Sequence, residues 1–333
     1  MIIHKKIYIF PLTINKSHYN KYVYHFAQAL NKKYDVINLK RKKNIGIFDL
    51  LICFRAKTFI FNWTENLNTL KYGKLQVLFY LIFVSILKLS RKNIIWIFHN
   101  KQPHDGKSRL SRLLMRYNAY ISNTIITHAK EGVEHLIASY QVSPDHIIYL
   151  PHPVYPEPVI VKKEKKYDII IWGNIEKYKR ILDFLHYWIK TGKSQQYKLL
   201  VCGKCNDKLY SQTIEQLTND NIIYQNEYLS ENELNSLISE SKIILFTYNS
   251  ESVLSSGALI YSLPFRNIII GPAIGAFKDL ANQGLIHTYN DMDEILNIIE
   301  TTEHDSNTML AIDNYLKLNT WDEFIKHIEC RKL

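Results

Sequence analysis

The sequence predicts an α/β protein with two doubly wound parallel sheets, on three observations. Short apolar segments rich in Ile, Val and aromatic residues alternate along the whole chain with amphipathic segments of helical period, as in βαβ units. The 333 residues suffice for two domains of ordinary size. Four prolines within 151–158, followed by the charged stretch 162–166, form a linker by composition. We expect the two domains to face a cleft at the carboxyl ends of both sheets.

Residues 1–152 form the predicted N-terminal domain. Its strands are short apolar runs with β-branched and aromatic residues, and its helices are longer and mostly amphipathic. The predicted strands cover 6–12, 34–39, 48–54, 59–63, 93–99, 124–127 and 147–150, and the predicted helices cover 19–30, 74–89, 110–120 and 131–140.

The predicted linker, 153–166, leads to a C-terminal domain over 167–317, and 318–333 forms a last helical segment. The alternation of strands and helices restarts after the linker, again with short apolar strands. The predicted strands cover 167–172, 197–202, 222–224, 242–248 and 267–270, and the predicted helices cover 181–189, 209–217, 231–239, 255–263, 277–283, 292–300, 308–318 and 321–329.

Composition is that of a globular protein, with 47% apolar and 22% charged residues. Four scattered cysteines and a first segment too polar for a signal peptide indicate a reducing, cytoplasmic compartment. Cys202 and Cys205 have the spacing of a redox or zinc pair. Because no second pair exists and Cys202 ends an apolar strand, we interpret them as structural.

Charge is spread unevenly along the chain. Residues 1–160 carry 23 Lys+Arg against 8 Asp+Glu, a net charge of +15, whereas residues 161–333 carry 19 against 23, a net charge of −4. A basic half indicates an anionic partner, for which nucleic acid, an anionic membrane surface or only solvent are open alternatives. Nucleic acid ranks last, because the aromatic residues lie within strands rather than among surface lysines.

The segment 74–89 is the most apolar of the predicted helices. Basic residues flank it, namely Lys71, Lys74, Lys88, Arg91 and Lys92. It is short for a membrane span, so a buried helix and a helix lying at the membrane interface both fit. With the basic half, the second alternative predicts a peripheral protein on the inner face of the membrane.

Titratable residues follow two predicted strands of the N-terminal domain. Glu65 comes just after 59–63, and His99, His104 and Asp105 follow the strand that ends at 98 or 99. Histidine titrates near neutral pH and a carboxyl with a raised pKa does so too, which suits removal of a hydroxyl proton. Histidines that only bond loop backbone are the alternative. Metal-ligand spacing and cysteine support are missing, so we expect no metal site.

Small and basic residues follow the first strand of the C-terminal domain. Gly173 and Asn174 come directly after 167–172, and Lys179 lies near the start of the next helix. A lysine beside a helix start can neutralise a diphosphate. The alternative for any single lysine is a solvated side chain.

The stretch from Phe246 to Ala258 is the one around which the C-terminal domain is organised. It ends a buried strand at Tyr248 and opens a helix with Ser255, Ser256, Gly257 and Ala258. Small residues let a ligand approach the backbone, and the first helical turn offers N–H groups to an anion. The segment therefore predicts a phosphate site, with an ordinary serine N-cap as the alternative.

Together these segments resemble bacterial polysaccharide glycosyltransferases of the GT-B fold, which has two Rossmann-like domains; the likeness is to family 4 and the glycosyltransferase family 1 group. The resemblance rests on Gly173-x5-Lys179, on 221–234, on Ser255-Ser-Gly257, on Asn62-Trp63-Thr-Glu65, on His99-Asn100-x-x-Pro103-His104-Asp105 and on Pro151-His152. The order of these motifs covers nearly the whole chain.

The resemblance implies transfer of a hexose from a UDP- or GDP-sugar co-substrate to a glycan or polyprenyl-diphosphate-linked acceptor, in surface polysaccharide biosynthesis. It implies no bound metal or cofactor. The C-terminal domain would hold the nucleotide and diphosphate, and the basic N-terminal domain would take the acceptor. A last helix, at Trp321, would cross back to the first domain.

The chain departs from the family pattern at several positions. Ser252 and Ile260 stand where family 4 has two glutamates eight positions apart, and Asn174 stands where many relatives have arginine. Retention or inversion at the sugar therefore stays open. Two other functions remain: a nucleotide-sugar epimerase of the same fold, and a degenerate, non-catalytic transferase acting as a binding or regulatory partner.

Overall fold

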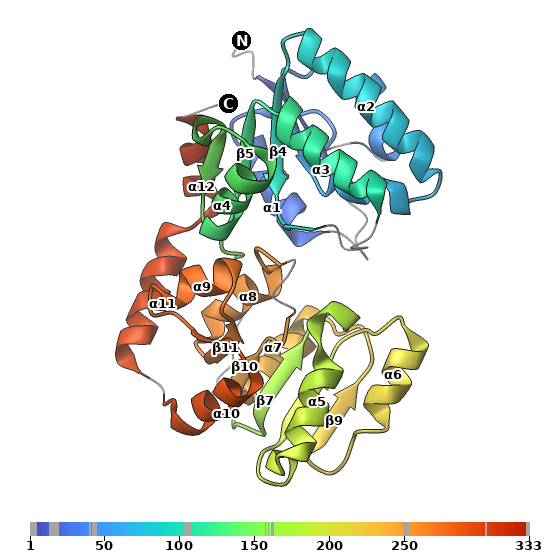
Figure 1. Ribbon diagram of the computed structural model, residues 1–333. Coiled ribbons are helices and arrows are strands. Elements are labelled where there is room, and N and C mark those ends of the chain that lie inside the picture. Colours follow the sequence, from blue (N-terminus) through green and yellow to red (C-terminus); the bar gives the residue numbers. More distant parts are fainter. Residues whose placement is uncertain are drawn as a thin grey trace. The chain divides into compact units, whose positions relative to one another are not determined.

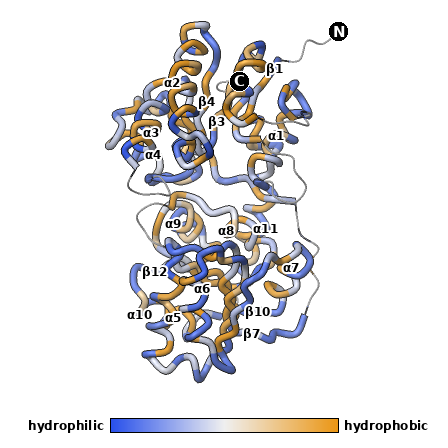
Figure 2. Tube along the Cα trace, turned by 90° about the vertical axis from the view of Figure 1, so that its right-hand side faces the viewer, coloured by the Kyte–Doolittle hydropathy of each residue, from blue (hydrophilic) through white to orange (hydrophobic). Residues whose placement is uncertain are grey.

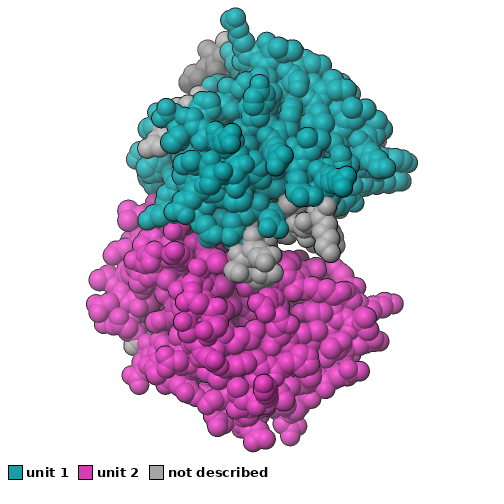
Figure 3. Space-filling model, viewed as in Figure 1, with its two compact units in different colours: residues 1–155, 251–255, 319–333 teal, residues 156–250, 256–318 magenta. Residues whose placement is uncertain are grey.

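Two parallel six-stranded sheets organise the chain in the computed structural model (Figure 1). The structure describes residues 5–12, 20–39, 41, 45–102, 108–156, 158, 160, 163–248, 253–303 and 305–330. Two units form: unit 1 comprises 1–155, 251–255 and 319–333, and unit 2 comprises 156–250 and 256–318; Figure 3 colours them separately. The predicted α/β class with two doubly wound sheets is confirmed.

In unit 1 the strand order is β2-β1-β3-β4-β5-β6. Chain order switches sides between β1 and β3, so the carboxyl ends of these two strands flank the topological switch point. The strands are β1 (Lys6–Phe10), β2 (Asp35–Val36), β3 (Thr58–Asn62), β4 (Asn93–Phe98), β5 (Thr124–Thr127) and β6 (Ile147–Tyr149). The helices are α1 (Lys21–Asn31), α2 (Gly73–Leu89), α3 (Arg109–Ile121), α4 (Lys130–Tyr140) and α12 (Trp321–Glu329), with 3-10 turns η1 (Gly46–Leu51), η2 (Thr64–Thr69) and η3 (Pro144–His146).

Alternate residues of β1 build the two cores of unit 1. Ile7 and Ile9 face a layer made with α1 and α12, whereas Tyr8 and Phe10 face a layer made with α2. This period of two is the pleat of a strand that is covered on both faces. The last helix therefore packs against the first sheet, through Trp321, Phe324, Ile325 and Ile328.

In unit 2 the strand order is β12-β11-β10-β7-β8-β9, so the switch point lies between β7 and β10. The strands are β7 (Tyr167–Trp172), β8 (Leu199–Cys202), β9 (Ile222–Gln225), β10 (Ser241–Leu245), β11 (Ile268–Pro272) and β12 (His287–Tyr289). The helices are α5 (Ile181–Lys190), α6 (Lys208–Glu215), α7 (Glu231–Ser239), α8 (Gly257–Ser262), α9 (Gly275–Ala281), α10 (Met292–Thr301) and α11 (Ser306–Leu318), with 3-10 turns η4 (Lys177–Lys179), η5 (Lys193–Gln195) and η6 (Leu263–Phe265).

Two predicted strands of the N-terminal half are wrong in type or length. The segment 48–54 is no strand: η1 occupies most of it, and Ile47 and Leu50 are buried at the three-residue spacing of a 3-10 turn. In 34–39 only Asp35–Val36 pairs with β1. There the Asn38 side chain accepts from Ile9 N (3.2 Å) and donates to Ile9 O (2.7 Å), which replaces the backbone ladder.

The strand β10 is shorter than the predicted strand 242–248, because it ends at Leu245. Beyond it, Phe246 N still donates to Ile270 O, and Phe246 O accepts from the Tyr289 hydroxyl at 2.9 Å. The short strand β12 was not expected from the sequence pattern. The predicted α7 begins with a capping box, in which Ser230 and Glu233 bond each other's backbone N–H. Residues 230–234 of the motif at 221–234 therefore form the start of a helix.

Candidate active site

The carboxyl ends of β7 and β10 are neighbours, because the two strands pair directly. Gly173 follows β7 with a φ of +95°, a conformation that favours glycine. A Cβ at this position would lie 3.1 Å from Nζ of Lys179. The chain therefore turns tightly here, and Lys179, the last residue of η4, folds its side chain back against the strand end.

Lys179 is a buried cation. Its residue exposure is 5%, and burial lowers the pKa of its ammonium to about 8. Nζ donates to Trp172 O at 3.3 Å and lies 5.6 Å from the centre of the Tyr248 ring. Within the part of the chain that the structure describes, no carboxylate forms an ion pair with it. A buried, unneutralised ammonium is costly, and an anionic ligand would remove that cost.

Tyr248 and Ser256 complete this group on the β10 side. The Tyr248 hydroxyl and Ser256 Oγ are 3.2 Å apart, and Ser256 Oγ also accepts from Leu259 N at 3.3 Å as the N-cap of α8. Thr247 on the same segment donates its hydroxyl to the backbone O of Lys179. Residues from two strand ends are thus joined by side-chain contacts at the switch point of unit 2.

The other predicted phosphate-binding residues are not joined to this group by a hydrogen bond. Asn174 is exposed. The hydroxyl of Ser255 is buried and finds no partner in the described residues, and Ser255 belongs to unit 1 by its contacts. Gly257 and Ala258 form the exposed and half-buried first turn of α8. Ser252, at the first of the two family glutamate positions, lies outside the described residues, and Ile260, at the second, is buried in α8.

In unit 1, His99 follows β4 and is buried. Its Nε2 lies 3.0 Å from Asn62 Oδ1, and Asn62 Nδ2 donates to Phe10 O at 3.1 Å. Asn62 therefore accepts through Oδ1, so His99 carries its proton on Nε2 and Nδ1 is the basic nitrogen of the neutral ring. The Trp63 ring stacks on the imidazole at 4.1 Å and 13°.

Tyr22 on α1 is the centre of a group of rings, of which the sequence pattern indicates His99 and His152 but neither Tyr22 nor His128. Its hydroxyl lies 2.8 Å from His128 Nε2, and His128 Nδ1 bonds Leu150 O at 2.9 Å. The rings of His99 and His152 contact Tyr22 edge-on at 5.0 and 5.1 Å. Burial lowers the pKa of His128 to about 4 and that of His152 to about 3, so both are neutral near pH 7. His128 follows β5, so the strand-end rule that indicated His152 after β6 would have found His128 too, had it been applied to every strand.

Glu65, in η2 after β3, is a buried carboxyl. Its Oε2 has no hydrogen-bond partner in the described residues, and burial raises its pKa to about 7. A short polar chain lies near it. The Tyr80 hydroxyl donates to Asn118 Oδ1 at 2.6 Å, and Asn118 Nδ2 donates to Thr64 Oγ1 at 2.6 Å. A carboxyl that titrates near neutral pH can take or give a proton under physiological conditions.

The remaining predicted catalytic residues, His104 and Asp105, lie outside the described residues. Among the residues that the structure does describe, no three His, Cys, Asp or Glu side chains lie together in a way that could hold a metal ion. The cysteines of the 202–205 pair are both buried and free.

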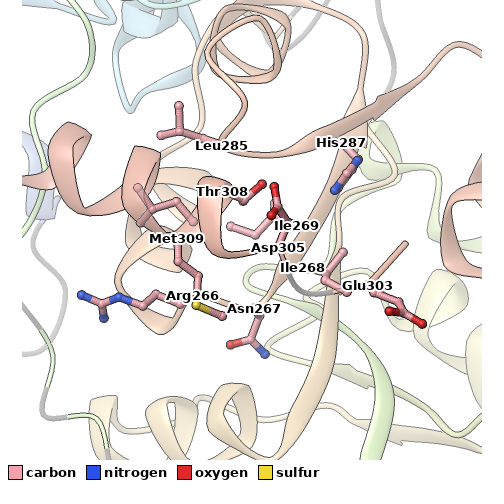
Figure 4. A pocket seen from close by; sticks show the side chains of 11 residues that line it. Arg266, Asn267, Ile268, Ile269, Leu285, His287, Glu303, Asp305, Thr308 and Met309 are labelled. Atoms are coloured by element: carbon pink, nitrogen blue, oxygen red, sulfur yellow. The ribbon is translucent and has the colours of Figure 1, made fainter. Parts of the chain in front are cut away.

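A small pocket of unit 2 lies at the amino ends of strands β11 and β12 (Figure 4). It includes Ile268 and His287, the first residues of β11 and β12, and side chains of α11 such as Thr308 and Met309. Because Lys179 follows the carboxyl end of β7, this pocket is separate from the candidate site.

No protein-family model and no curated protein matches this sequence. Solved structures do match it. HepE from Anabaena, in complex with UDP and glucose, has a TM-score of 0.67 at 11% identity, covering 98% of this chain and 100% of HepE. A glycosyltransferase from Rickettsia africae has a TM-score of 0.64 at 12% identity, covering 99% and 98%.

TarM has a TM-score of 0.61 at 11% identity over 87% of this chain, which spans 59% of TarM. A variant of TarM from S. aureus was solved in complex with Fondaparinux, alpha-GlcNAc-glycerol and UDP. Agreement over nearly the whole length of HepE and of the Rickettsia enzyme includes both sheets. The chain therefore has the two-domain GT-B fold of solved glycosyltransferases, as the resemblance of its motifs predicted.

Proposed function

We propose that this protein is a glycosyltransferase that moves a hexose from a nucleotide-diphosphate sugar to an acceptor hydroxyl. The observation that carries the proposal is Lys179, a buried ammonium without a carboxylate partner at the switch point of unit 2. Ligands of doubly wound sheets bind at that point. Glu176 acts on this ammonium without an ion pair, and a diphosphate would supply the directly bonded negative charge.

In the proposed reaction, the bond between the anomeric carbon and the diphosphate oxygen breaks and its electron pair goes to the diphosphate. Lys179 stabilises the charge that develops on this leaving group. The Ser256 hydroxyl, held between Tyr248 and the start of α8, donates to the same group. Gly173, Asn174, Ser255 and the N–H groups of Gly257 and Ala258 line the remainder of the donor site.

The acceptor oxygen forms the new bond to the anomeric carbon, and its proton passes to a base. His99 is our first candidate for that base, because Asn62 fixes its proton on Nε2 and leaves Nδ1 basic. Glu65 is the second, since burial places its pKa at about 7. His104 and Asp105 stay candidates on sequence grounds. Retention and inversion both remain compatible with this set.

UDP is the nucleotide we favour, because HepE and TarM were solved with UDP, and GDP is the alternative. We expect no bound metal or other cofactor. The proposed acceptor is a glycan, linked to a polyprenyl diphosphate, in the synthesis of a surface polysaccharide. Such an acceptor lies in a membrane, so the proposal includes a cytoplasmic protein held peripherally at the inner membrane surface through basic unit 1.

Thermal unfolding with a panel of UDP, GDP, CDP, ADP and their sugar conjugates tests the donor site. A nucleotide at a hundred times its Kd adds about 2.7 kcal/mol to the free energy of unfolding, which is a visible shift of the midpoint. We expect a shift with uridine nucleotides that the Lys179→Met variant lacks. Absence of any shift would contradict a nucleotide-sugar site and favour the non-catalytic binding protein.

Product analysis then separates the two enzymes that share this fold. Wild-type protein with the stabilising UDP-sugar and no acceptor is examined for interconversion of the sugar. An epimerase produces a second UDP-sugar under these conditions, whereas a transferase requires an acceptor before UDP is released. Formation of an epimerised sugar would therefore overturn the transfer reaction while leaving the donor site in place.

A further inference from the structure

The outward face of α2 is apolar along its whole length. Five of its residues, at spacings of three and four, have exposures from 43% to 84%: Leu75, Leu78, Ile82, Ile86 and Leu89. From position 75 to the end of the helix, these are the residues classed as exposed, so this face carries no polar side chain at an exposed position. Figure 2 shows hydrophobic turns recurring along α2.

The inward face of α2 is also apolar, and it packs against the sheet of unit 1 through Val77, Tyr80, Val84 and Leu87. A helix with one apolar face buried normally presents polar residues on the other. Scattered exposed leucines need no explanation, but a continuous apolar stripe indicates an interaction surface. Among the helices of the described residues, none has both the length and the apolar content that crossing a membrane requires.

Basic residues lie at both ends of this stripe. Lys71 and Lys74 are exposed at its start, and Lys88, Arg91 and Lys92 follow at its end. In the described part of the chain, none of the five forms an ion pair with a carboxylate. Between residues 54 and 92 the sequence has one acidic residue, Glu65, which is buried. The stripe is thus apolar, and the positive charges at its two ends are not paired with carboxylates of the described residues.

We propose that α2 lies flat on an anionic phospholipid bilayer, with its leucine and isoleucine stripe among the acyl chains and its flanking cations at the phosphates. Apolar area and attraction to anionic lipid act together in such interfacial helices. The long lysine and arginine stems reach the headgroups while their carbons cover apolar surface. The Nζ of Lys92 lies 4.8 Å from the centre of the Phe54 ring, so one of these cations is already next to an apolar side chain.

A second copy of the chain is the other occupant that an apolar face could take. It would bring the cations of two equivalent surfaces together without an acidic partner, and like charges at an interface oppose association. Charge complementarity therefore favours the anionic bilayer. This inference concerns the surface of unit 1 alone. Failure of membrane binding would leave the proposed donor site intact, and failure of the donor site would leave membrane binding intact.

Vesicle flotation with the full chain, without nucleotide or acceptor, tests the inference. Vesicles of a phosphatidylcholine and phosphatidylglycerol mixture are compared with vesicles of phosphatidylcholine alone. We expect wild type to float with the mixed vesicles and to be released by salt, which screens exposed charges. Leu78→Gln with Ile82→Gln should weaken partition by about tenfold for each side chain, because each loses its burial in the acyl region.

The matched control replaces two exposed leucines of unit 2, Leu209 (73% exposed) and Leu310 (61% exposed), by Gln. It should bind as wild type does. In the second arm, Lys71→Gln with Lys74→Gln should weaken binding to mixed vesicles roughly 25-fold, at about fivefold for each cation. Lys190→Gln with Lys208→Gln, both exposed in unit 2, is its control.

Two outcomes would overturn the inference. One is binding that the α2 variant leaves unchanged. The other is absence of vesicle binding together with a concentration-dependent dimer in sedimentation velocity that Leu78→Gln with Ile82→Gln abolishes, which would assign the stripe to a second copy. Both α2 substitutions replace exposed residues by a good helix former, so the fold should persist, and a normal thermal shift with UDP would verify it.

Discussion

The two sheets end in buried titratable groups of opposite character. After β7 and β10, unit 2 buries an ammonium, Lys179, whose neighbours are a carbonyl and an aromatic ring. After β4, β5 and β6, unit 1 buries three histidines, and two of them, His128 and His152, are held neutral by burial. In the described residues no carboxylate forms an ion pair with Lys179, whereas His128 bonds Tyr22 and Leu150 O, and His99 bonds Asn62.

This difference indicates what each end is built to take. An uncompensated cation raises the free energy of the empty site and returns that energy when an anion binds, so unit 2 suits a diphosphate. Neutral imidazoles carry no net charge, and a carboxyl with a pKa of about 7 is partly ionised near pH 7, so this end gives a diphosphate no attraction and suits an uncharged hydroxyl. The proposed division into donor and acceptor sides therefore has a physical basis within each unit.

The largest expected effect comes from removing the cation of unit 2. Lys179→Met should lower kcat about 100- to 1,000-fold, the range for loss of one group that stabilises transition-state charge. Lys177→Met in the same turn is the control, because Lys177 is exposed and pairs with Asp207. Steady-state kinetics with the stabilising nucleotide sugar measures both. Full activity of Lys179→Met would exclude Lys179 from the site.

Stability against pH checks that Lys179 is a buried ammonium. Folded Lys179 releases its proton near pH 8, whereas the unfolded chain holds it up to about 10.5. Between these values the unfolded state binds more protons, so stability rises with pH. Wild type should gain on the order of 3 kcal/mol relative to Lys179→Met over this window, in urea unfolding. A flat difference would contradict the burial.

The carboxyl of unit 1 gives the next effect. The pKa of Glu65 is about 7 in the folded state against 4.5 for a solvated glutamate in an unfolded chain, so the stability that its protonated form contributes is complete below 4.5 and is lost as pH rises through 7. Glu65→Gln keeps the neutral form at every pH. It should therefore gain on the order of 3 kcal/mol over wild type between pH 4.5 and 8.

The control for Glu65→Gln is Glu134→Gln, an exposed carboxyl on α4. It should leave the pH dependence of urea unfolding as in wild type. If Glu65→Gln unfolds with the wild-type pH profile, Glu65 is ionised in the folded state and the contrast between the two sheet ends is weaker than we argue. Its kcat separates a base from a structural carboxyl, because only loss of the base abolishes turnover.

The fold could be predicted because the apolar alternation is long and regular. The errors fall where a side chain replaces backbone pairing, as Asn38 does beside β1, or where apolar residues recur at a spacing of three, as in η1. Amino-acid composition reveals neither the bonding of the Asn38 side chain nor the three-residue spacing in η1. For the segment 74–89 a buried and an interfacial helix stayed open, and the structure shows one buried apolar face and one exposed apolar face.

The candidate site could be predicted in outline for unit 2, because parallel strands end at one edge of a sheet. That rule selected Gly173, Lys179, Tyr248 and Ser256, which the structure joins, although their roles stay predictions. It could not predict that Lys179 is buried, since its cover comes from separate segments. It also could not find Tyr22, which lies on a helix rather than at a strand end.

The smallest effect separates the two adjacent serines before α8. Ser256 Oγ accepts from Leu259 N, so Ser256→Ala should cost about 1 kcal/mol of unfolding free energy as a lost N-cap. Ser255 Oγ is buried without a partner in the described residues, so Ser255→Ala should leave stability unchanged or raise it. Urea unfolding of both variants measures the difference. Equal losses would mean that the cap is not formed as described.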